Sequence, residues 1–334
     1  MKTPEIVLFS RPLGWPTETD FAMRDIELDS IREGEVLVRT IWLSVDPYLR
    51  GRMSAGKSYI APFELDQPLS SGGIGQVVSS MDPSLDEGDF VMGDFKWREF
   101  DNISAVKLAK VDSDQAPLSA YLGVLGMPGL TAFVGLRRIG ELKPSDTVFV
   151  SAAAGAVGSM VGQIAKISGA TVIGSAGSPE KVNSLLAKGL DFAFNYKERP
   201  VSQALREFAP NGLDLYFDNV GGDHLRDSIS NMANFGRIVM CGAISQYNLS
   251  TPPPGLSNIS LVVSRRLTLR GFIVSDHGDM RESFLSEAIG WLRHGKLAYD
   301  ETVRSGLAQA PKAFLELLEG VNLGKMLVKV SEPV

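Results

Sequence analysis

At 334 residues the chain is too long for one simple core and has the length of two domains. With 44% hydrophobic and 22% charged residues it holds ample apolar material to bury, which excludes a disordered protein. The net charge of −6 comes without a basic block, which argues against nucleic acid or an anionic membrane as partner and favours a small molecule.

Residues 5 to about 122 consist of short apolar runs separated by Gly, Pro and Asp. Two such runs lie at 34–48 and 75–80, and residues 86–100 add a turn followed by an aromatic strand. Short strands divided by turn residues predict a compact β-rich domain.

The pattern changes after residues 127–129, where strand-like runs begin to alternate with segments of helical length. Strands are predicted at 147–151, 170–176, 191–195, 213–219 and 236–242, and helices at 157–168, 179–188, 201–209 and 222–233. This βαβ alternation is typical of a parallel sheet covered on both faces. The sequence therefore predicts a doubly wound domain.

The last part of the chain combines both patterns. A proline tract at 251–254 precedes a segment, 261–274, whose end is predicted to be a strand; amphipathic stretches follow at 283–294 and 308–319. The final predicted strand, 325–330, resembles those of the first domain. We therefore predict that 1–123 and 300–334 form one domain and that 124–299 form the other.

The strongest motif is SAAAGAVGS at residues 151–159, directly after a predicted strand and opening a predicted helix. Its spacing is A-x-G-x-x-G, with Ala153 in place of the first glycine of the Rossmann fingerprint. Gly155 lets the backbone approach a pyrophosphate, and Gly158 lets the helix pack closely on the strand. The alternative is that these glycines serve close packing only. The strand before, the helix after and the further βα units favour dinucleotide binding.

The end of the second predicted strand indicates which dinucleotide is bound. An NAD-preferring site usually has an Asp or Glu about 20 residues beyond the motif, whereas residues 174–181 read GSAGSPEK. Small residues and the cation Lys181 suit a 2′-phosphate. A compatible alternative makes Ser178 a helix N-cap, Pro179 the first helical residue and Lys181 a solvated side chain. We predict NADPH rather than NADH.

Metal ligands are scarce in the sequence. A catalytic zinc needs three protein ligands, commonly Cys and His, but the chain has one cysteine and three histidines, His224, His277 and His294, without a short paired spacing. We expect no metal site and histidines that lie at the surface or at helix caps. Without a Lewis acid, alcohol oxidation is disfavoured, and hydride donation to an activated acceptor remains.

The single cysteine, Cys241, cannot form an internal disulfide, and residues 1–10 lack the long apolar segment of a secretory signal. No stretch approaches the roughly 18 apolar residues that a membrane helix needs. We therefore expect a cytoplasmic protein with no membrane partner.

Several motifs together resemble the zinc-independent medium-chain reductases of the leukotriene B4 dehydrogenase/prostaglandin reductase type, to which NADPH-dependent curcumin reductase and plant double-bond reductases are similar. The resemblance spans the chain through VDPYLR (45–50), GMPGLTAF (126–133), SAAAGAVGS (151–159), AGSPEK (176–181), NYK (195–197), YFDNVGG (216–222), CGAISQYN (241–248), GFIVSD (271–276) and NLGKMLVKV (322–330). It implies a GroES-like β-rich catalytic domain joined to a Rossmann domain, and it implies a homodimer.

The resemblance also implies a set of site residues. Tyr247 matches the residue assigned to the chemistry, and Tyr48 matches a substrate-pocket tyrosine, although either tyrosine taken alone is more often a packing residue. Asp46 and Arg50 in the same segment as Tyr48 receive no chemical role and are expected to pair and shape the turn. The cofactor-binding positions are Gly155, Ala156, Val157, Gly158, Ser178, Lys181, Tyr196, Asn219, Cys241, Gly242, Ala243, Ile244, Ser245, Tyr247, Phe272, Ile273, Val274 and Asn322.

The activity implied is NADPH-dependent reduction of the C=C bond of α,β-unsaturated ketones and aldehydes. Tyr247, with the nicotinamide ribose hydroxyl, would stabilise the enolate oxygen that develops after hydride transfer. The alternatives are an NADPH:quinone reductase and, in another class, a non-catalytic NADPH-binding or RNA-binding regulator.

Overall fold

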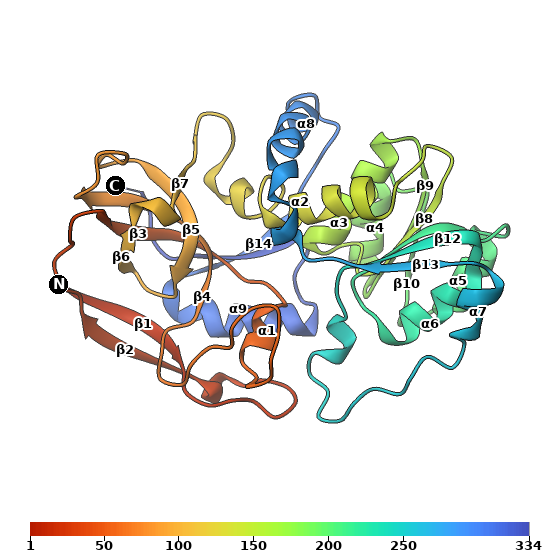
Figure 1. Cartoon of the computed structure of the whole chain (residues 1–334), viewed down its shortest axis with the longest axis horizontal. Coiled ribbons are helices and arrows are strands. Elements are labelled where there is room, and N and C mark those ends of the chain that lie inside the picture. The colour runs from red at the N-terminus through yellow and green to blue at the C-terminus, as the bar shows by residue number, and fades with distance from the viewer. Residues whose placement is uncertain (334) are drawn as a thin grey trace. The chain divides into compact units, whose positions relative to one another are not determined.

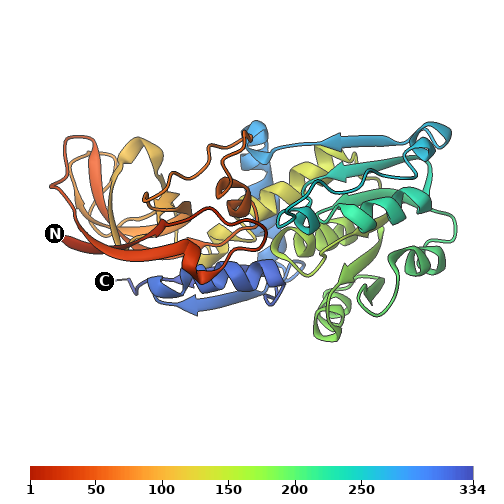
Figure 2. The same cartoon turned by 90° about the horizontal axis from the view of Figure 1, so that it is seen from below.

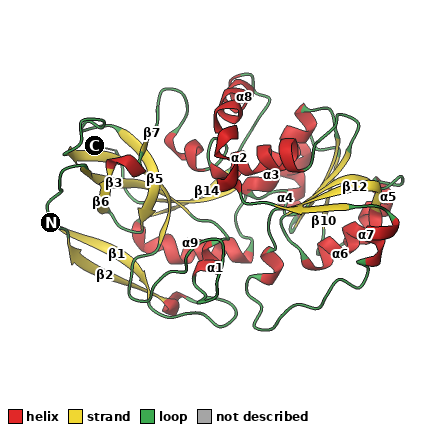
Figure 3. Cartoon of the chain, in the orientation of Figure 1, coloured by secondary structure: helices red, strands yellow, loops and turns green. Residues whose placement is uncertain are grey.

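The computed structural model describes residues 1–333, which form two compact units. One unit comprises Met1–Gly123 together with the residues from Glu301 onward, and the other comprises Val124–Asp300. Figure 1 labels the elements of each unit, and Figure 3 separates their helices from their strands. No helix in the described part of the chain is both long enough and apolar enough to span a membrane.

The first unit is rich in β-structure. Its elements are β1 (Lys2–Leu8), β2 (Phe21–Glu27), β3 (Glu35–Ser44), α1 (Leu49–Arg52), β4 (Ser70–Ser80), β5 (Phe90–Lys96), β6 (Phe100–Ser104), β7 (Ala109–Lys110), β14 (Glu301–Ser305), α9 (Ala310–Glu319) and β15 (Lys325–Lys329). The main sheet has the order β14-β15-β3-β4-β5-β7, with β6 added to β3, and β1 and β2 form a separate antiparallel pair. The core of this unit includes Trp97 and, from α9, Phe314.

The predicted strand at 325–330 is present as β15 and pairs antiparallel with β3, Leu327 lying opposite Ser44. Its other neighbour, β14, was not predicted. Five residues that include Glu301 and Arg304 carry too few apolar side chains to indicate a strand, and the segment is held by its parallel pairing with β15.

The second unit is a doubly wound α/β fold, as the sequence predicts. Its elements are α2 (Met127–Val134), β8 (Thr147–Val150), α3 (Ala156–Ile167), β9 (Thr171–Ala176), α4 (Pro179–Ala187), β10 (Phe192–Asn195), α5 (Val201–Phe208), β11 (Leu213–Asp218), α6 (Gly222–Asn231), β12 (Met232–Met240), α7 (Ser260–Ser264), β13 (Thr268–Gly271) and α8 (Arg281–Arg293). All pairs in the sheet β10-β9-β8-β11-β12-β13 are parallel. Helices lie on both faces of this sheet (Figures 1 and 2).

Successive side chains of the central strands point to opposite faces. Phe149 of β8 and Tyr216 of β11 stack with ring centroids 5.0 Å apart and share a core with residues of α5 and α6. All three side chains of Val148, Phe149 and Val150 are buried, because both faces of the sheet are covered. This explains why these strands appear in the sequence as continuous apolar runs.

The sequence pattern did not predict α2 or the π-helical turn Gly135–Ile139 that continues it. Every residue of α2 after Met127 is buried, so the segment lacks the polar face that marks an amphipathic helix. Its Pro128 lies in the first turn, where the missing N–H costs nothing.

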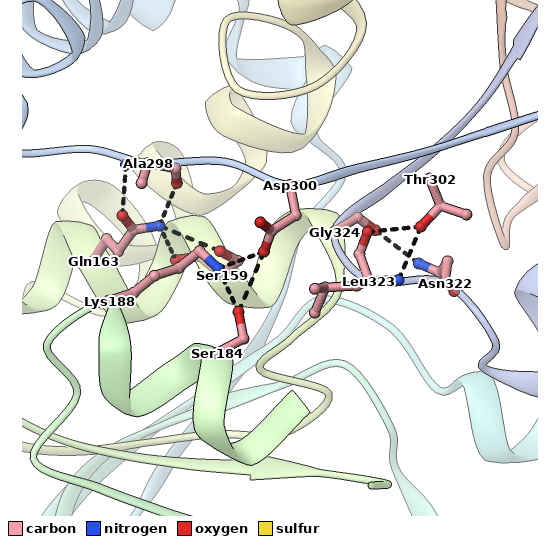
Figure 4. Close-up of polar contacts among 10 residues, drawn as sticks. All are labelled: Ser159, Gln163, Ser184, Lys188, Ala298, Asp300, Thr302, Asn322, Leu323 and Gly324. Carbon is pink, nitrogen blue, oxygen red and sulfur yellow. Dashed lines mark hydrogen bonds and ion pairs between the residues drawn. The ribbon is translucent and has the colours of Figure 1, made fainter. Parts of the chain in front are cut away.

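The segment that leaves α8 is fastened to the second unit before the chain enters β14 (Figure 4). The side-chain amide of Gln163 donates to the carbonyl of Ala298 and accepts from its N–H, each at 2.8 Å. Lys188 pairs with Asp300, and Ser184 also donates to that carboxylate at 3.3 Å. Residues on α3 and α4 therefore fix the end of this unit.

Candidate functional site

The turn after β8 joins the strand to α3. Gly155 is the N-cap of α3, and Ala152 holds a left-handed backbone conformation with φ of 48°. A Cβ at Gly158 would lie 2.3 Å from the carbonyl oxygen of Ala152, so only glycine fits there. The first-turn amides of α3, including those of Ala156 and Val157, form a helix N-terminus that attracts anions. The turn thus has the construction of a pyrophosphate site.

The end of β9 leads into a second helix N-terminus. Ser178 is the N-cap of α4, its hydroxyl accepts from the N–H of Lys181 at 3.4 Å, and Pro179 occupies the first turn, as the sequence predicts. Gly177 lies against the loop after β10, because a Cβ built there would be 3.3 Å from both the Tyr196 hydroxyl and the Lys197 side chain. Four polar side chains therefore gather at this strand end.

Two of these side chains carry like charge. Burial lowers the pKa of Lys181, and the nearby charge of Lys197 lowers it further. Two ammonium groups held near one another favour an anion between or beside them. Sequence reasoning missed Lys197, although it directly follows Tyr196 in the NYK motif; only its closeness to Gly177 and Lys181 distinguishes it from a solvated lysine.

His224, on α6, is a correction to the expectation that the histidines lie at the surface or at caps. Its side chain is buried and packs edge-on against the ring of Tyr196, with ring centroids 5.0 Å apart. Burial lowers the pKa of His224 to about 4, an effect that the charges of Asp227 and Asp223 partly oppose. His224 is therefore neutral at physiological pH and supports the half-exposed Tyr196 ring.

Asn219 follows β11 and is tied back to β8. Its side-chain amide donates to the carbonyl of Ser151 at 2.8 Å, and its N–H donates to the Ser151 hydroxyl at 3.0 Å. Residues 241–247 follow β12 and lie beside the loop that contains Asn219, since the N–H groups of Cys241 and Gly242 donate to the carbonyl of Asp218 at 2.9 and 3.0 Å. The loops after β8, β11 and β12 therefore meet at the carboxyl edge of the sheet.

Within residues 241–247, the side chains differ in what they offer a ligand. Burial raises the pKa of the Cys241 thiol to about 12, so this residue offers its backbone and not a reactive thiolate. The Ser245 hydroxyl donates to the carbonyl of Val220 at 2.6 Å. Ala243 and Ile244 lie between Cys241 and Ser245 in the chain. The loop is thus held by the segment that follows Asn219.

Tyr247 folds back over its own loop. Its hydroxyl accepts from the N–H of Ala243 at 3.3 Å and lies close to Gly242, where a Cβ would be 3.2 Å away. Burial raises the pKa of Tyr247, so the phenol keeps its proton at neutral pH. A protonated hydroxyl that accepts from the backbone is free to donate to a further oxygen.

The predicted residues Phe272, Ile273 and Val274 follow β13, at the same edge of the sheet as the other loops. The Phe272 ring lies beside the π-helical turn, because a Cβ at Gly135 would be 3.2 Å from its Cζ atom. The second unit therefore contains all the predicted cofactor residues except Asn322, each in a segment that follows a strand at the carboxyl edge of its sheet.

Tyr48 and Asn322 belong to the first unit. Burial and the nearby Asp46 carboxylate raise the pKa of Tyr48, which keeps its phenol protonated. Arg50 donates to the carbonyl of Gly14 at 2.7 Å, and Asp46 pairs with Lys325 at 2.9 Å. Asp46 and Arg50 are thus held by partners that lie far away in the sequence, whereas the sequence predicted that they pair with each other.

Asn322 is buried, and its side chain donates to the carbonyl of Gly324 at 2.7 Å (Figure 4). Beside it, the hydroxyl of Thr302 donates to the Leu323 carbonyl at 2.9 Å and accepts from its N–H at 3.0 Å. The turn before β15 is therefore fixed by β14.

Comparisons with known proteins cover nearly the whole chain. Residues 4–111 match the family described as the N-terminal domain of oxidoreductase, and residues 156–289 match the zinc-binding dehydrogenase family. The 2-alkenal reductase (NADP(+)-dependent) of Nicotiana tabacum is 41% identical over 98% of this chain and 97% of its own. Prostaglandin reductase 1 of Bos taurus is 43% identical over 95% of this chain and 96% of its own.

The solved structure of CurA from Vibrio vulnificus in complex with NADPH is 38% identical, covers 99% of this chain and all of its own, and superposes with a TM-score of 0.93. This chain belongs to the zinc-independent medium-chain reductases of the prostaglandin reductase type. The β-rich unit and the doubly wound unit of this medium-chain reductase are the fold that the sequence predicts. Within residues 1–333 of the reductase, no group of three or more His, Cys, Asp or Glu side chains has the arrangement of a metal site.

Proposed function

We propose that this reductase uses NADPH to reduce the C=C bond of α,β-unsaturated ketones and aldehydes. The observation that carries the proposal is full-length similarity to an NADP(+)-dependent 2-alkenal reductase, to an NADPH-dependent curcumin reductase and to the CurA structure that binds NADPH. When bound, NADPH supplies the hydride that the β-carbon of the conjugated carbonyl compound accepts. The residues of this chain supply binding, orientation and charge stabilisation.

The pyrophosphate is assigned to the turn Gly155–Gly158, where the close approach of Gly158 to Ala152 leaves no space for a side chain. The 2′-phosphate is assigned to Ser178, Lys181 and Tyr196, with Lys197 as a further cation. No carboxylate stands at Ala176 and Gly177, the end of β9, where an NAD-preferring site usually has an Asp or Glu. These features support NADPH over NADH.

The nicotinamide half is assigned to the loops that meet at the carboxyl edge of the sheet. The residues concerned are Asn219, Cys241, Gly242, Ala243, Ile244, Ser245, Phe272, Ile273 and Val274, and from the first unit Asn322. The support for this assignment is that ligands of doubly wound folds bind outside the carboxyl ends of the strands.

Tyr247 is assigned to the chemistry. Negative charge develops on the carbonyl oxygen of the substrate as the β-carbon is reduced, and a phenol that keeps its proton can donate to that oxygen. Burial keeps Tyr247 in this form, and the N–H of Ala243 holds its oxygen in place. Tyr48 is assigned to the substrate pocket, where its buried phenol likewise offers a donor.

The reductase is also proposed to be a cytoplasmic homodimer. The strand β13 pairs with β12 on one side only, and three of its four residues are exposed. Val263, shortly before β13 in the sequence, exposes 79% of its surface, and Phe235 of β12, whose N–H donates to the carbonyl of Arg265 at 2.8 Å, exposes 68%. An unpaired strand edge with exposed apolar neighbours supports pairing with a second copy. The unpaired Cys241 suits a reducing compartment.

The decisive experiment is a panel of enones, enals and simple quinones assayed with NADPH and with NADH in parallel. Reduction of the enone C=C bond, with NADPH preferred, is the expected result. Turnover of quinones alone would replace the proposal with a quinone reductase. Binding of NADPH without turnover of any acceptor would favour a regulator.

A further inference from the structure

A group of buried polar side chains lies at the point where the strand order of the second unit's sheet reverses. From β8 the chain proceeds to β9 and β10 on one side, whereas β11 leads to β12 and β13 on the other. The group consists of Ser151, directly after β8, and of Tyr216 and Asp218 on β11. We call it the Ser151–Tyr216–Asp218 cluster. All three residues are at most 1% exposed.

One carboxylate oxygen of Asp218 makes most of the contacts of the cluster, and the Tyr216 hydroxyl also lies 3.0 Å from the Ser151 hydroxyl. Its Oδ1 atom accepts from the Tyr216 hydroxyl at 2.6 Å, the Ser151 hydroxyl at 3.3 Å, and the N–H groups of Val220 and Gly221 at 2.9 and 2.8 Å. Its Oδ2 atom is buried and has no hydrogen-bond partner among residues 1–333. Burial raises the pKa of Asp218, which these hydrogen bonds partly oppose.

The cluster connects the three loops to which the cofactor and Tyr247 are assigned. Ser151 precedes the phosphate-binding turn, and its hydroxyl and carbonyl both accept from Asn219. The carbonyl of Asp218 accepts from Cys241 and Gly242, and the carbonyl of Asn219 accepts from Ile244 at 3.2 Å. The position of each loop therefore depends on the others through a few buried hydrogen bonds.

Stability alone is a poor reason for this arrangement. A buried carboxyl group with one unpartnered oxygen costs free energy, and apolar side chains would fill the same space at lower cost. The contacts instead fix the backbone after β11 and β12, where small displacements change the orientation of a bound ring. Misplacement by about 1 Å can cost about 100-fold in rate.

We propose that Ser151, Tyr216 and Asp218 are positioning residues. They hold Asn219 and residues 241–247, to which the nicotinamide half of the cofactor is assigned, in fixed positions relative to one another. The inference rests on the proposed function. It separates the two halves of the site, because none of the hydrogen bonds that the cluster side chains make within residues 1–333 reaches the loops around Ser178 and Tyr196 that are assigned to the 2′-phosphate. Losing a cluster hydrogen bond is therefore expected to slow turnover and to leave binding of the adenosine half intact.

The test compares Ser151→Ala with Ser175→Ala. Ser175 lies next to Ser151 across the sheet, at the end of β9, is completely buried and has a hydroxyl without a hydrogen-bond partner among the described residues. Each change deletes one buried serine hydroxyl, but only Ser151→Ala removes hydrogen bonds of the cluster. A second variant, Tyr216→Phe, removes the 2.6 Å contact to Asp218 and keeps the ring stacked on Phe149.

Three measurements are made on each variant and on the unchanged protein: hydrogen exchange of the amides in 219–221 and 241–247 without cofactor, affinity for 2′,5′-ADP, and enone turnover with protiated and deuterated NADPH. In Ser151→Ala and Tyr216→Phe we expect faster exchange, 2′,5′-ADP affinity within about 2-fold, kcat lowered about 10- to 100-fold and a larger deuterium isotope effect on kcat. Ser175→Ala is expected to change none of these.

The inference is overturned if exchange and kcat are unchanged in the cluster variants, if 2′,5′-ADP affinity falls as much as kcat, or if Ser175→Ala behaves like Ser151→Ala. Failure of the proposed function gives a different result. In that case the unchanged protein itself does not bind 2′,5′-ADP or does not turn over enones, before any variant is compared.

Discussion

Lys325 and Asp46 form a buried ion pair at 2.9 Å, although 279 positions separate them in the sequence. The Lys325 ammonium also donates to the carbonyl of Val45 at 2.7 Å, and the Ser44 hydroxyl donates to Asp46. Both charged side chains are less than a tenth exposed. The pair joins β15 to the end of β3, and it lies two residues from Tyr48 and three residues from Asn322 in the sequence.

Lys325→Met is expected to destabilise the protein by about 3–5 kcal/mol, because it leaves the Asp46 carboxylate buried without its cation. Adding Asp46→Asn should recover part of this loss, since the unpaired charge is then removed. Urea unfolding measures both effects. Lys110→Met is the control, because Lys110 pairs with Asp89 in the same unit with half of its side chain exposed. An equal loss in the control would show that burial of the Lys325 pair is unimportant.

Tyr247→Phe is expected to lower enone turnover by about 10²–10³, because it removes the donor assigned to the developing oxyanion. Binding of NADPH should persist, since the backbone of the loop is held by Asp218 and Val220. Steady-state kinetics and a fluorescence titration with NADPH measure the two quantities. Tyr121→Phe deletes the same atom where the hydroxyl donates to the Asp112 carbonyl in the first unit, and it should leave turnover unchanged. Full activity in Tyr247→Phe would remove this residue from the chemistry.

Lys181→Ala and Lys197→Ala are each expected to raise the KM for NADPH by about 10- to 100-fold, the size of a lost hydrogen bond to a charged group. NADH has no 2′-phosphate, so its KM in the same variants serves as the internal control and should hardly change. The effect on NADPH should weaken at high salt, because ions screen the exposed part of this site. Parallel losses for both nucleotides would mean that the lysines only support α4 and its neighbouring loop.

The buried His224 should make the stability of the second unit depend on pH. Its pKa is about 4 in the folded protein and about 6.5 when unfolded, so between these values the unfolded chain binds more protons. Stability therefore rises with pH through this window and is lost as the pH falls below about 6.5. At about 1.4 kcal/mol for each pH unit, the shift corresponds to a loss of about 3 kcal/mol.

Urea unfolding checks this dependence. It is measured for the unchanged protein and for His224→Gln between pH 4.5 and pH 7.5, about the range over which an ordinary histidine titrates. The variant cannot titrate at this position, so its curve should be flatter by about that amount. Identical pH dependence in the two proteins would show that another group controls the acid sensitivity.

Local patterns in the sequence were sufficient for most of the second unit. The alternation of apolar runs and helical segments predicts β8 to β12 with their helices, because each element is specified by residues that are neighbours in the chain. Ser178 and Pro179 mark the start of α4 for the same reason, through a cap and a first turn that involve four consecutive residues. The resemblance of nine motifs supplied the family and the activity.

Other features were decided only by the tertiary structure. The helix α2 was missed because burial on all sides removes the polar face that marks a helix, and β14 was missed because its strand character depends on pairing with β15. Crossover connections and sheet pairing bring distant segments together. As a result Ser151 is hydrogen-bonded to Asp218, Lys181 lies near Lys197, and Lys325 forms an ion pair with Asp46. A sequence specifies each of these residues singly, but their charges, burial and hydrogen bonds exist only between segments that the fold has placed side by side.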